Sequence, residues 1–110
     1  SDVLPDDQKL VLEIARVIRL GFLQQNAFHE EDTYVPMEKQ LKMMEIILYL
    51  YEKCKALIDM HMPMALLRED PVFEKVISIK YDVGNKELYK FEEYRSMIDE
   101  FYQKILAVNA

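Results

Sequence analysis

The chain has 110 residues, of which 20 are acidic and 14 are basic, so its formal net charge is −6. Such a chain lacks the basic footprint that neutralises phosphates, so we expect no nucleic-acid partner. A hydrophobic fraction of 51% with 31% charged residues is typical of one globular domain. The longest apolar run, Ile46 to Tyr51, is too short to span a bilayer.

Helical spacing of apolar residues dominates the sequence and predicts an all-α fold. We expect one domain over residues 1–110, a small bundle with three main helices and one or two short ones. The first helix is predicted to begin near Pro5-Asp6-Asp7, because acids after a proline suit a helix N-terminus. Gly21 lies near its predicted end. The stretch 24–35 is non-periodic and is predicted to be a loop.

The second helix is predicted to run from Pro36 to about Met60. Two adjacent apolar rows make a broad surface that is expected to face the core. The first row is Met37, Leu41, Met44, Leu48 and Tyr51, and the second is Met43, Ile47, Leu50, Cys54 and Leu57. Charged residues, Lys39 among them, are expected largely off these rows.

The second half of the chain predicts shorter elements before a final long helix. Pro63 breaks the pattern, and a short helix is expected around Met64 to Leu67. Asp70-Pro71 predicts another helix N-terminus, with a helix to about Lys80. A turn at 83–85 then precedes a last helix from about Lys86 to Ala107.

Three consecutive amides between two aromatic residues stand out in the loop, in the run 22–28 (FLQQNAF). Amides both donate and accept hydrogen bonds, and an aromatic face can stack on a planar base. The composition therefore suits a purine pocket. The alternative is an ordinary helix-terminating loop with packed aromatic residues, which spacing alone favours.

Metal and nucleophile chemistry finds little support. A single cysteine and two histidines cannot build a closed zinc site. The run His29–Asp32 is typical of a solvated acidic loop rather than a metal site. His61 lies among Met60, Met62 and Met64, which allows a Cu(I) site, although methionine as core filler is the commoner case. Cys54 falls on an apolar row and is expected to be inert. We therefore expect no catalytic and no metal-binding residue.

Two stretches resemble the catalytic A subunit of the archaeal and vacuolar-type (A/V-type) rotary ATP synthases and ATPases. The first is Leu4–Arg19 followed by Phe22–Phe28, and the second is Asp32–Pro36 (DTYVP) with Glu38–Gln40 (EKQ). Weaker similarity continues to the C-terminus. The resemblance implies the C-terminal helical domain of a longer subunit in an ATP-driven or ATP-making proton or sodium pump.

The resemblance also implies roles for particular residues. Phe28 would contact the adenine of ATP, with Gln24, Gln25 and Ala27 forming the wall of that pocket. The run Leu4, Pro5, Asp6, Asp7 and Gln8 would meet the central rotor stalk. ATP or ADP with Mg²⁺ would be bound by the intact subunit, and none tightly by this domain alone. The family's phosphate-binding loop is absent here, so this chain alone is not expected to hydrolyse ATP.

The implied partners are the central stalk and the non-catalytic B-type subunit. The implied location is cytoplasmic, with the membrane reached only through other subunits. If helix one has lost a neighbour, the isolated chain should expose apolar surface and self-associate. The competing interpretation is a free-standing helical adaptor that binds partner helices and has no nucleotide role.

Overall fold

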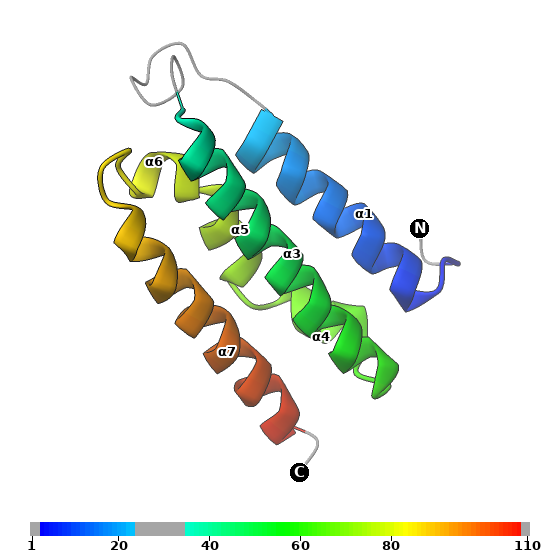
Figure 1. The fold of residues 1–110 in the computed structure, drawn as a ribbon. Coiled ribbons are helices and arrows are strands. Elements are labelled where there is room, and N and C mark those ends of the chain that lie inside the picture. Colours follow the sequence, from blue (N-terminus) through cyan, green and yellow to red (C-terminus); the bar gives the residue numbers. More distant parts are fainter. Residues whose placement is uncertain (1–2, 24–34, 109–110) are drawn as a thin grey trace.

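The computed structural model describes residues 3–23 and 35–108, and the regular elements within these ranges are all helical. The predicted all-α fold is confirmed. Three long helices lie side by side, with α3 (Met37–Asp59) between α1 (Asp6–Ile18) and α7 (Phe91–Val108) (Figure 1). The molecule is elongated, with extents of 42 × 28 × 19 Å.

The first helix starts where the sequence predicted and continues past Gly21. Pro5 is the N-cap residue, and Asp6 and Asp7 occupy the first turn, where the positive end of the helix dipole favours acids. After Ile18 the backbone widens into a π-helical turn, η1 (Arg19–Leu23). Gly21 therefore lies inside a helical turn.

The second long helix, α3, follows Pro36 as its N-cap residue and ends at Asp59. Its end has a local cause, because His61 adopts a left-handed backbone with φ of 70°. The main-chain amides of His61 and Met62 donate to the carbonyls of Ile58 (2.8 Å) and Leu57 (3.0 Å). The chain then reverses direction.

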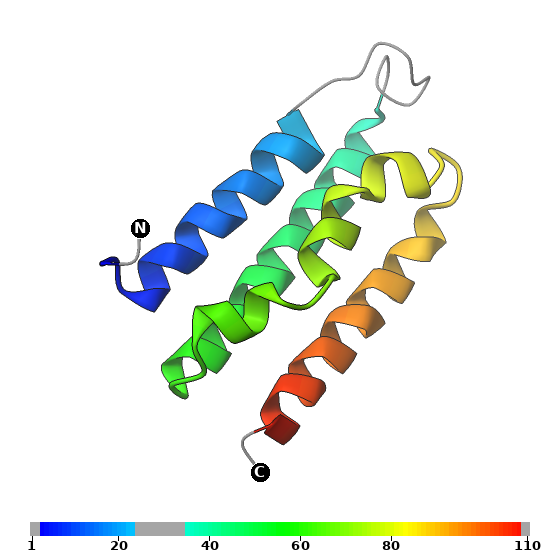
Figure 2. The same cartoon turned by 180° about the vertical axis from the view of Figure 1, so that it is seen from behind.

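Three short helices cover one side of α3, between α1 and α7 (Figure 2). They are α4 (Met64–Arg68), α5 (Val72–Ile77) and α6 (Ile79–Asp82). The prediction of one helix to Lys80 is wrong in detail, since Ser78 interrupts it. The Asp70 carboxylate starts α5 by accepting the amide of Val72 at 2.9 Å.

The last long helix begins later than predicted. A turn at 83–86 is closed by Glu87, whose Oε1 accepts the Gly84 amide at 2.9 Å. That hydrogen bond is the main reason that the pKa of Glu87 lies below its usual value, and the Lys90 ammonium adds to it. A 3₁₀ turn, η2 (Leu88–Lys90), then leads into α7.

The core lies where α3 meets the other helices. The second row predicted on α3 is buried, as expected: Met43, Ile47, Leu50, Cys54 and Leu57. The first row was predicted wrongly as core, because Met37, Leu41 and Leu48 are 67%, 58% and 52% exposed. Met44 and Tyr51 of that row are half-buried. No helix of the described residues is long and apolar enough to cross a membrane.

Candidate functional site

The run Leu4–Gln8, for which the family resemblance implies a stalk contact, forms the start of α1 at one end of the molecule (Figure 1). Pro5, Asp7 and Gln8 are exposed, and Leu4 and Asp6 are half-buried. Asp6 faces inward to another element, since its Oδ2 accepts the main-chain amide of Met64 at 3.0 Å. The carboxylate thereby caps the start of α4. Asp7 is the exposed acid of this turn.

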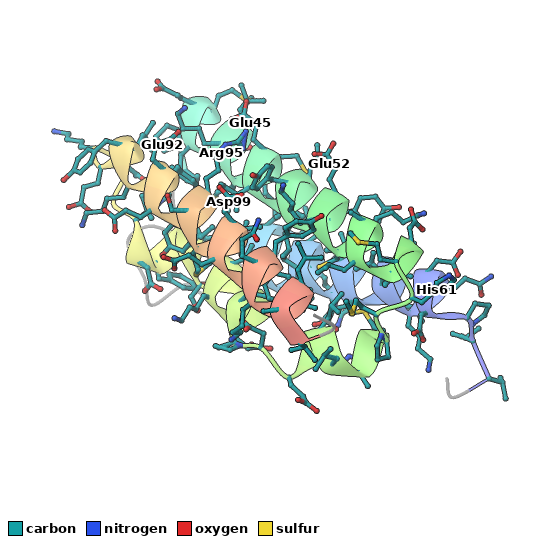
Figure 3. The ribbon with its side chains drawn as sticks, turned by 90° about the horizontal axis from the view of Figure 1, so that it is seen from below. Glu45, Glu52, His61, Glu92, Arg95 and Asp99 are labelled. Atoms are coloured by element: carbon teal, nitrogen blue, oxygen red, sulfur yellow. The ribbon has the colours of Figure 1, made fainter. Side chains whose placement is uncertain are left out.

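The turn after α3 lies at the same end of the molecule. His61 is exposed there (Figure 3). Met62 and Met64 are buried in the core, whereas Met60 is 41% exposed. Two of the three methionines next to His61 thus act as core filler, as the commoner interpretation held. The described residues contain no group of three or more His, Cys, Asp or Glu side chains that could hold a metal ion.

The residues predicted for the adenine pocket, Gln24, Gln25, Ala27 and Phe28, lie outside the described residues. The run His29–Asp32 does so too. What the structure describes is the chain on either side of them. The end of η1 and the start of α3 lie together at the end of the molecule opposite Leu4–Gln8 (Figure 1).

Gly21 lies two residues before Leu23, the last described residue ahead of position 24, and it packs tightly against α5. A Cβ atom at this position would lie 3.0 Å from both the Cα and the carbonyl oxygen of Ile77. Both atoms belong to backbone, which yields less readily than a flexible side chain. Any larger residue here would force the end of α5 to shift, so glycine suits the close approach of η1 to α5.

Lys39, in the first turns of α3, is fully buried. Its ammonium donates to the carbonyl oxygens of Lys80 at 2.9 Å and Val83 at 2.5 Å, and to Oδ1 of Asn85 at 3.1 Å. The carbonyls at a helix C-terminus have no intrahelical partner and carry partial negative charge. Lys39 thus caps α6 from within the core. The expectation that Lys39 lies off the buried rows is wrong.

The neighbouring Gln40 holds the chain just before α3. Its Nε2 donates to the carbonyl oxygen of Val35 at 2.8 Å. The backbone amide of Gln40 donates to the carbonyl of Pro36 at 3.0 Å, which closes the first turn of the helix. Gln40 of the EKQ motif therefore fixes the first described residues after position 34.

Sequence reasoning missed the hydrogen bonds made by Lys39 and by Gln40, although the sequence carried a signal for the burial of Lys39. Lys39 lies four residues before Met43 and eleven before Leu50, so it extends the buried row backward by one turn. A lysine in register with such a row requires acceptors inside the fold. Its acceptors lie more than 40 positions along the chain, so the sequence pattern alone could not name them.

Arg16, in the last turn of α1, connects this helix to α5. Its guanidinium pairs with Glu13 at 2.8 Å and with Glu74 at 2.6 Å. These hydrogen bonds raise the pKa of Arg16, with Glu13 contributing most. The Arg16–Glu74 ion pair orients α1 against the short helices. Solvent partly screens this pair because Glu74 is exposed.

A charged seam runs along the outside of α3 and α7. Figure 3 shows Glu45 and Glu52 on α3 beside Arg95 and Asp99 on α7. The Arg95 guanidinium lies 4.2 Å from the ring centroid of Tyr49, a cation–π geometry. Tyr49 donates a hydrogen bond to Asp99, and this bond is the main cause of the raised pKa of Tyr49. The seam is typical of helix–helix packing at the surface.

Cys54 has the environment of an inert thiol. It is fully buried on α3, and burial raises its pKa to about 12, with smaller contributions from Glu13 and Asp70. The thiolate, which is the nucleophile, is therefore scarce at neutral pH. This agrees with the expectation from its place on an apolar row.

Comparisons with known proteins identify the family. The family model for the C-terminal domain of V and A type ATP synthase matches residues 1–66. The V-type ATP synthase alpha chain 2 of Clostridium tetani is 41% identical over 106 residues, which cover 96% of this chain and 18% of that protein.

Two further relatives agree over the same region. The V-type ATP synthase alpha chain of Halothermothrix orenii is 43% identical over 105 residues, and the A subunit of the A-type ATP synthase of Methanopyrus kandleri is 38% identical over 105 residues. In both cases 96% of this chain is covered, and the chain spans 18% of the relative's length. The chain therefore belongs to the family of C-terminal domains of V and A type ATP synthases.

Proposed function

We propose that this chain works as the C-terminal helical domain of a catalytic A subunit, in a complex that couples ATP to proton or sodium movement. In that complex it completes the adenine pocket through Gln24, Gln25, Ala27 and Phe28. The turn Leu4–Gln8 meets the central stalk. The partners are the stalk and the non-catalytic B-type subunit, and the domain is cytoplasmic and peripheral to the membrane.

The observation that supports this proposal is the helical path between the two proposed contacts. Helix α1 continues into η1 without a break from Asp6 to Leu23. The 13 residues of α1 alone span about 20 Å at the usual helical rise. A displacement of the Leu4–Gln8 turn by the stalk would therefore also displace Gly21, which precedes the proposed adenine loop. The position of the stalk and the shape of the adenine pocket would then change together.

The inward role of Asp6 narrows the proposed stalk contact. Asp6 already accepts the Met64 amide, so Asp7 is the acid that a basic partner would meet. Phosphate and Mg²⁺ binding would come from elsewhere in the subunit, because this sequence contains no GxxxxGK(S/T) phosphate-binding loop. This domain contributes recognition of the base, and the phosphoryl transfer itself needs other groups.

The adenine role can be tested in a chimera in which this chain replaces the corresponding region of the Clostridium tetani alpha chain 2. Phe28→Ala should raise KM for ATP about tenfold, a loss of about 1.4 kcal/mol of base contact, with little change in kcat. The neighbouring His29→Ala serves as the control. An unchanged KM for Phe28→Ala would remove the adenine role.

The stalk role needs a separate measurement in the same chimera. Asp7→Lys should lower ATP-driven ion transport relative to ATP hydrolysis, because a reversed charge repels the basic partner. Glu92→Lys is the matched control, since Glu92 is also an exposed acid in the first turn of a helix but lies at the other end of the molecule (Figure 3). If the ratio of ion transport to ATP hydrolysis were the same in Asp7→Lys as in the control variant, the proposed stalk contact would be removed and the adaptor interpretation favoured.

A further inference from the structure

Two parts of the chain rest on one short block of the fold that is far from both of them in sequence. The block is Ile77–Val83, which contains the end of α5, Ser78 and α6, and we call it the α5–α6 block. One part is η1, which ends at Leu23, and the other is the start of α3 with the preceding Val35. Figure 1 shows η1, the start of α3 and α6 at the same end of the molecule.

The η1 side is held by exclusion of space. Gly21 is buried, and a Cβ there would stand 3.0 Å from the Ile77 Cα and carbonyl oxygen. The backbone of η1 thus packs against the backbone at the end of α5 with no room for a side chain at position 21 unless one of the two shifts. A shift of Ile77 towards Gly21 would therefore displace η1.

The α3 side is held by hydrogen bonds. Lys39 donates to the carbonyls of Lys80 and Val83, so the first turns of α3 are fastened to the same block. Gln40 donates to the Val35 carbonyl at 2.8 Å, which fixes the two-residue approach to α3. The buried ammonium is surrounded by protein, so its hydrogen bonds are protected from competition with water.

We propose that Gly21, Lys39 and Gln40 are positioning residues, which fix the two points Leu23 and Val35 relative to each other through the α5–α6 block. The consequence for nucleotide affinity rests on the proposed adenine role of Gln24–Phe28. The positioning itself does not depend on that role. Lys39 and Gln40 of the EKQ motif, which had no assigned task, then hold the chain from Val35 onward, and Gly21 holds it before position 24.

The positioning is tested on the 110-residue chain with spin labels at Leu23→Cys and Met37→Cys. Both side chains are exposed, and the buried Cys54 should stay unlabelled because its pKa is about 12. Electron paramagnetic resonance gives the distance distribution between the labels. Lys39→Met and Gly21→Ala should each broaden or shift that distribution.

Matched controls separate positioning from general disturbance. Lys42→Met replaces a half-exposed lysine on the same helix, and Arg19→Ala truncates an exposed side chain in the same π-helical turn as Gly21. Neither should change the distribution. Should Lys39→Met fail to fold by circular dichroism, Lys39→Gln tests the same end, because its polar side chain is too short to reach both carbonyl groups. Distributions unchanged in Gly21→Ala and in the folded α3 variant would overturn the proposal.

A second arm, in the chimeric complex, separates this inference from the proposed function. Lys39→Met or Gln40→Ala should raise KM for ATP about tenfold while kcat changes little, equal to about 1.4 kcal/mol of binding. A broadened distribution with unchanged KM would support the positioning role and remove the adenine role. A narrow distribution with raised KM would remove the positioning role and leave the adenine role standing.

Discussion

The two neighbouring faces of α3 are both apolar in sequence, yet the structure treats them in opposite ways. The face through Met43 and Leu50 is buried, and it begins with a fully buried lysine, Lys39. The face through Leu41 and Leu48 is more than half exposed. Burial along α3 is therefore decided by which elements pack on it, because hydropathy alone would have placed Leu41 inside and Lys39 outside.

The covering elements explain the difference. Helix α7 and α1 flank α3, and the short helices α4–α6 close the side between them (Figure 2). Lys39 points into this covered region and finds the carbonyl groups of Lys80 and Val83. A buried ammonium is tolerated when such acceptors replace water. Leu41 and Leu48 lie on the side that no described helix covers.

Truncation of a leucine on each face gives the largest contrast. Leu50→Ala should lower the free energy of unfolding by about 4 kcal/mol, because it leaves a cavity at a fully buried site. Leu48→Ala, two positions away, should change it by no more than about 0.5 kcal/mol. Urea titration monitored by circular dichroism measures both. Similar losses in the two variants would show that both faces are covered in solution.

Removal of the buried lysine should be nearly as damaging. Lys39→Ala takes the donor away from the buried carbonyls of Lys80 and Val83 and leaves a void, so we expect a loss of about 3 kcal/mol. The same titration on Lys42→Ala, a half-exposed lysine of α3, should show a loss below about 0.5 kcal/mol. A mild effect of Lys39→Ala would mean that water reaches this site.

Burial of Cys54 on this face should also make the free energy of unfolding depend on pH. The pKa of Cys54 is raised from 9.0 to about 12 by burial, so the unfolded chain loses this proton at lower pH than the folded chain does. Its contribution to stability is complete below pH 9 and is lost as the pH rises towards 12. The loss should approach about 1.4 kcal/mol per pH unit.

Comparison with Cys54→Ala isolates this effect from the titration of lysines and tyrosines. The difference in unfolding free energy between the two proteins should be constant from about pH 7 to 8 and should shrink above about pH 9. A difference that stays constant up to about pH 10.5 would mean that the thiol is hydrated in the folded state.

Substitutions on the exposed face of α3, through Leu41 and Leu48, should change self-association more than they change the free energy of unfolding. The apolar side chains of this face, together with exposed Val11 and Leu12 on α1, favour self-association of the isolated chain. Sedimentation velocity at high concentration should show oligomers that Leu41→Ser with Leu48→Ser removes. Tyr89→Ser with Val108→Ser, two exposed apolar sites elsewhere, should leave them intact. A monomeric parent chain at every concentration would contradict this.

Local signals were sufficient for most of the fold. Prolines at 5, 36 and 63 mark helix starts to within one or two residues, because a fixed φ and a missing amide suit that position. The break at Ser78 was not predicted, since no proline or glycine stands there. The choice between the two rows of α3 also needed tertiary structure, as it depends on where α1 and α7 pack.

For the candidate site, too, some residues could be predicted from the sequence and others needed the tertiary structure. The resemblance to a family supplied Leu4–Gln8 and Gln24–Phe28, but it gave no account of Asp6 as the cap of α4. That hydrogen bond joins residues 58 positions apart, beyond the reach of any local pattern. Lys39 carried a local signal, its register with Met43 and Leu50, whereas the identity of its acceptors did not.

The methionines of this chain carry a chemical consequence of the same architecture. Met37 and Met60 flank the two ends of α3 and are exposed, whereas Met43, Met62 and Met64 are buried. Peroxide converts accessible thioethers to sulfoxides first. Brief oxidation followed by mass spectrometry would thus mark both ends of α3 in a single sample. When a partner covers either end, its presence would be recorded as a methionine that escapes oxidation.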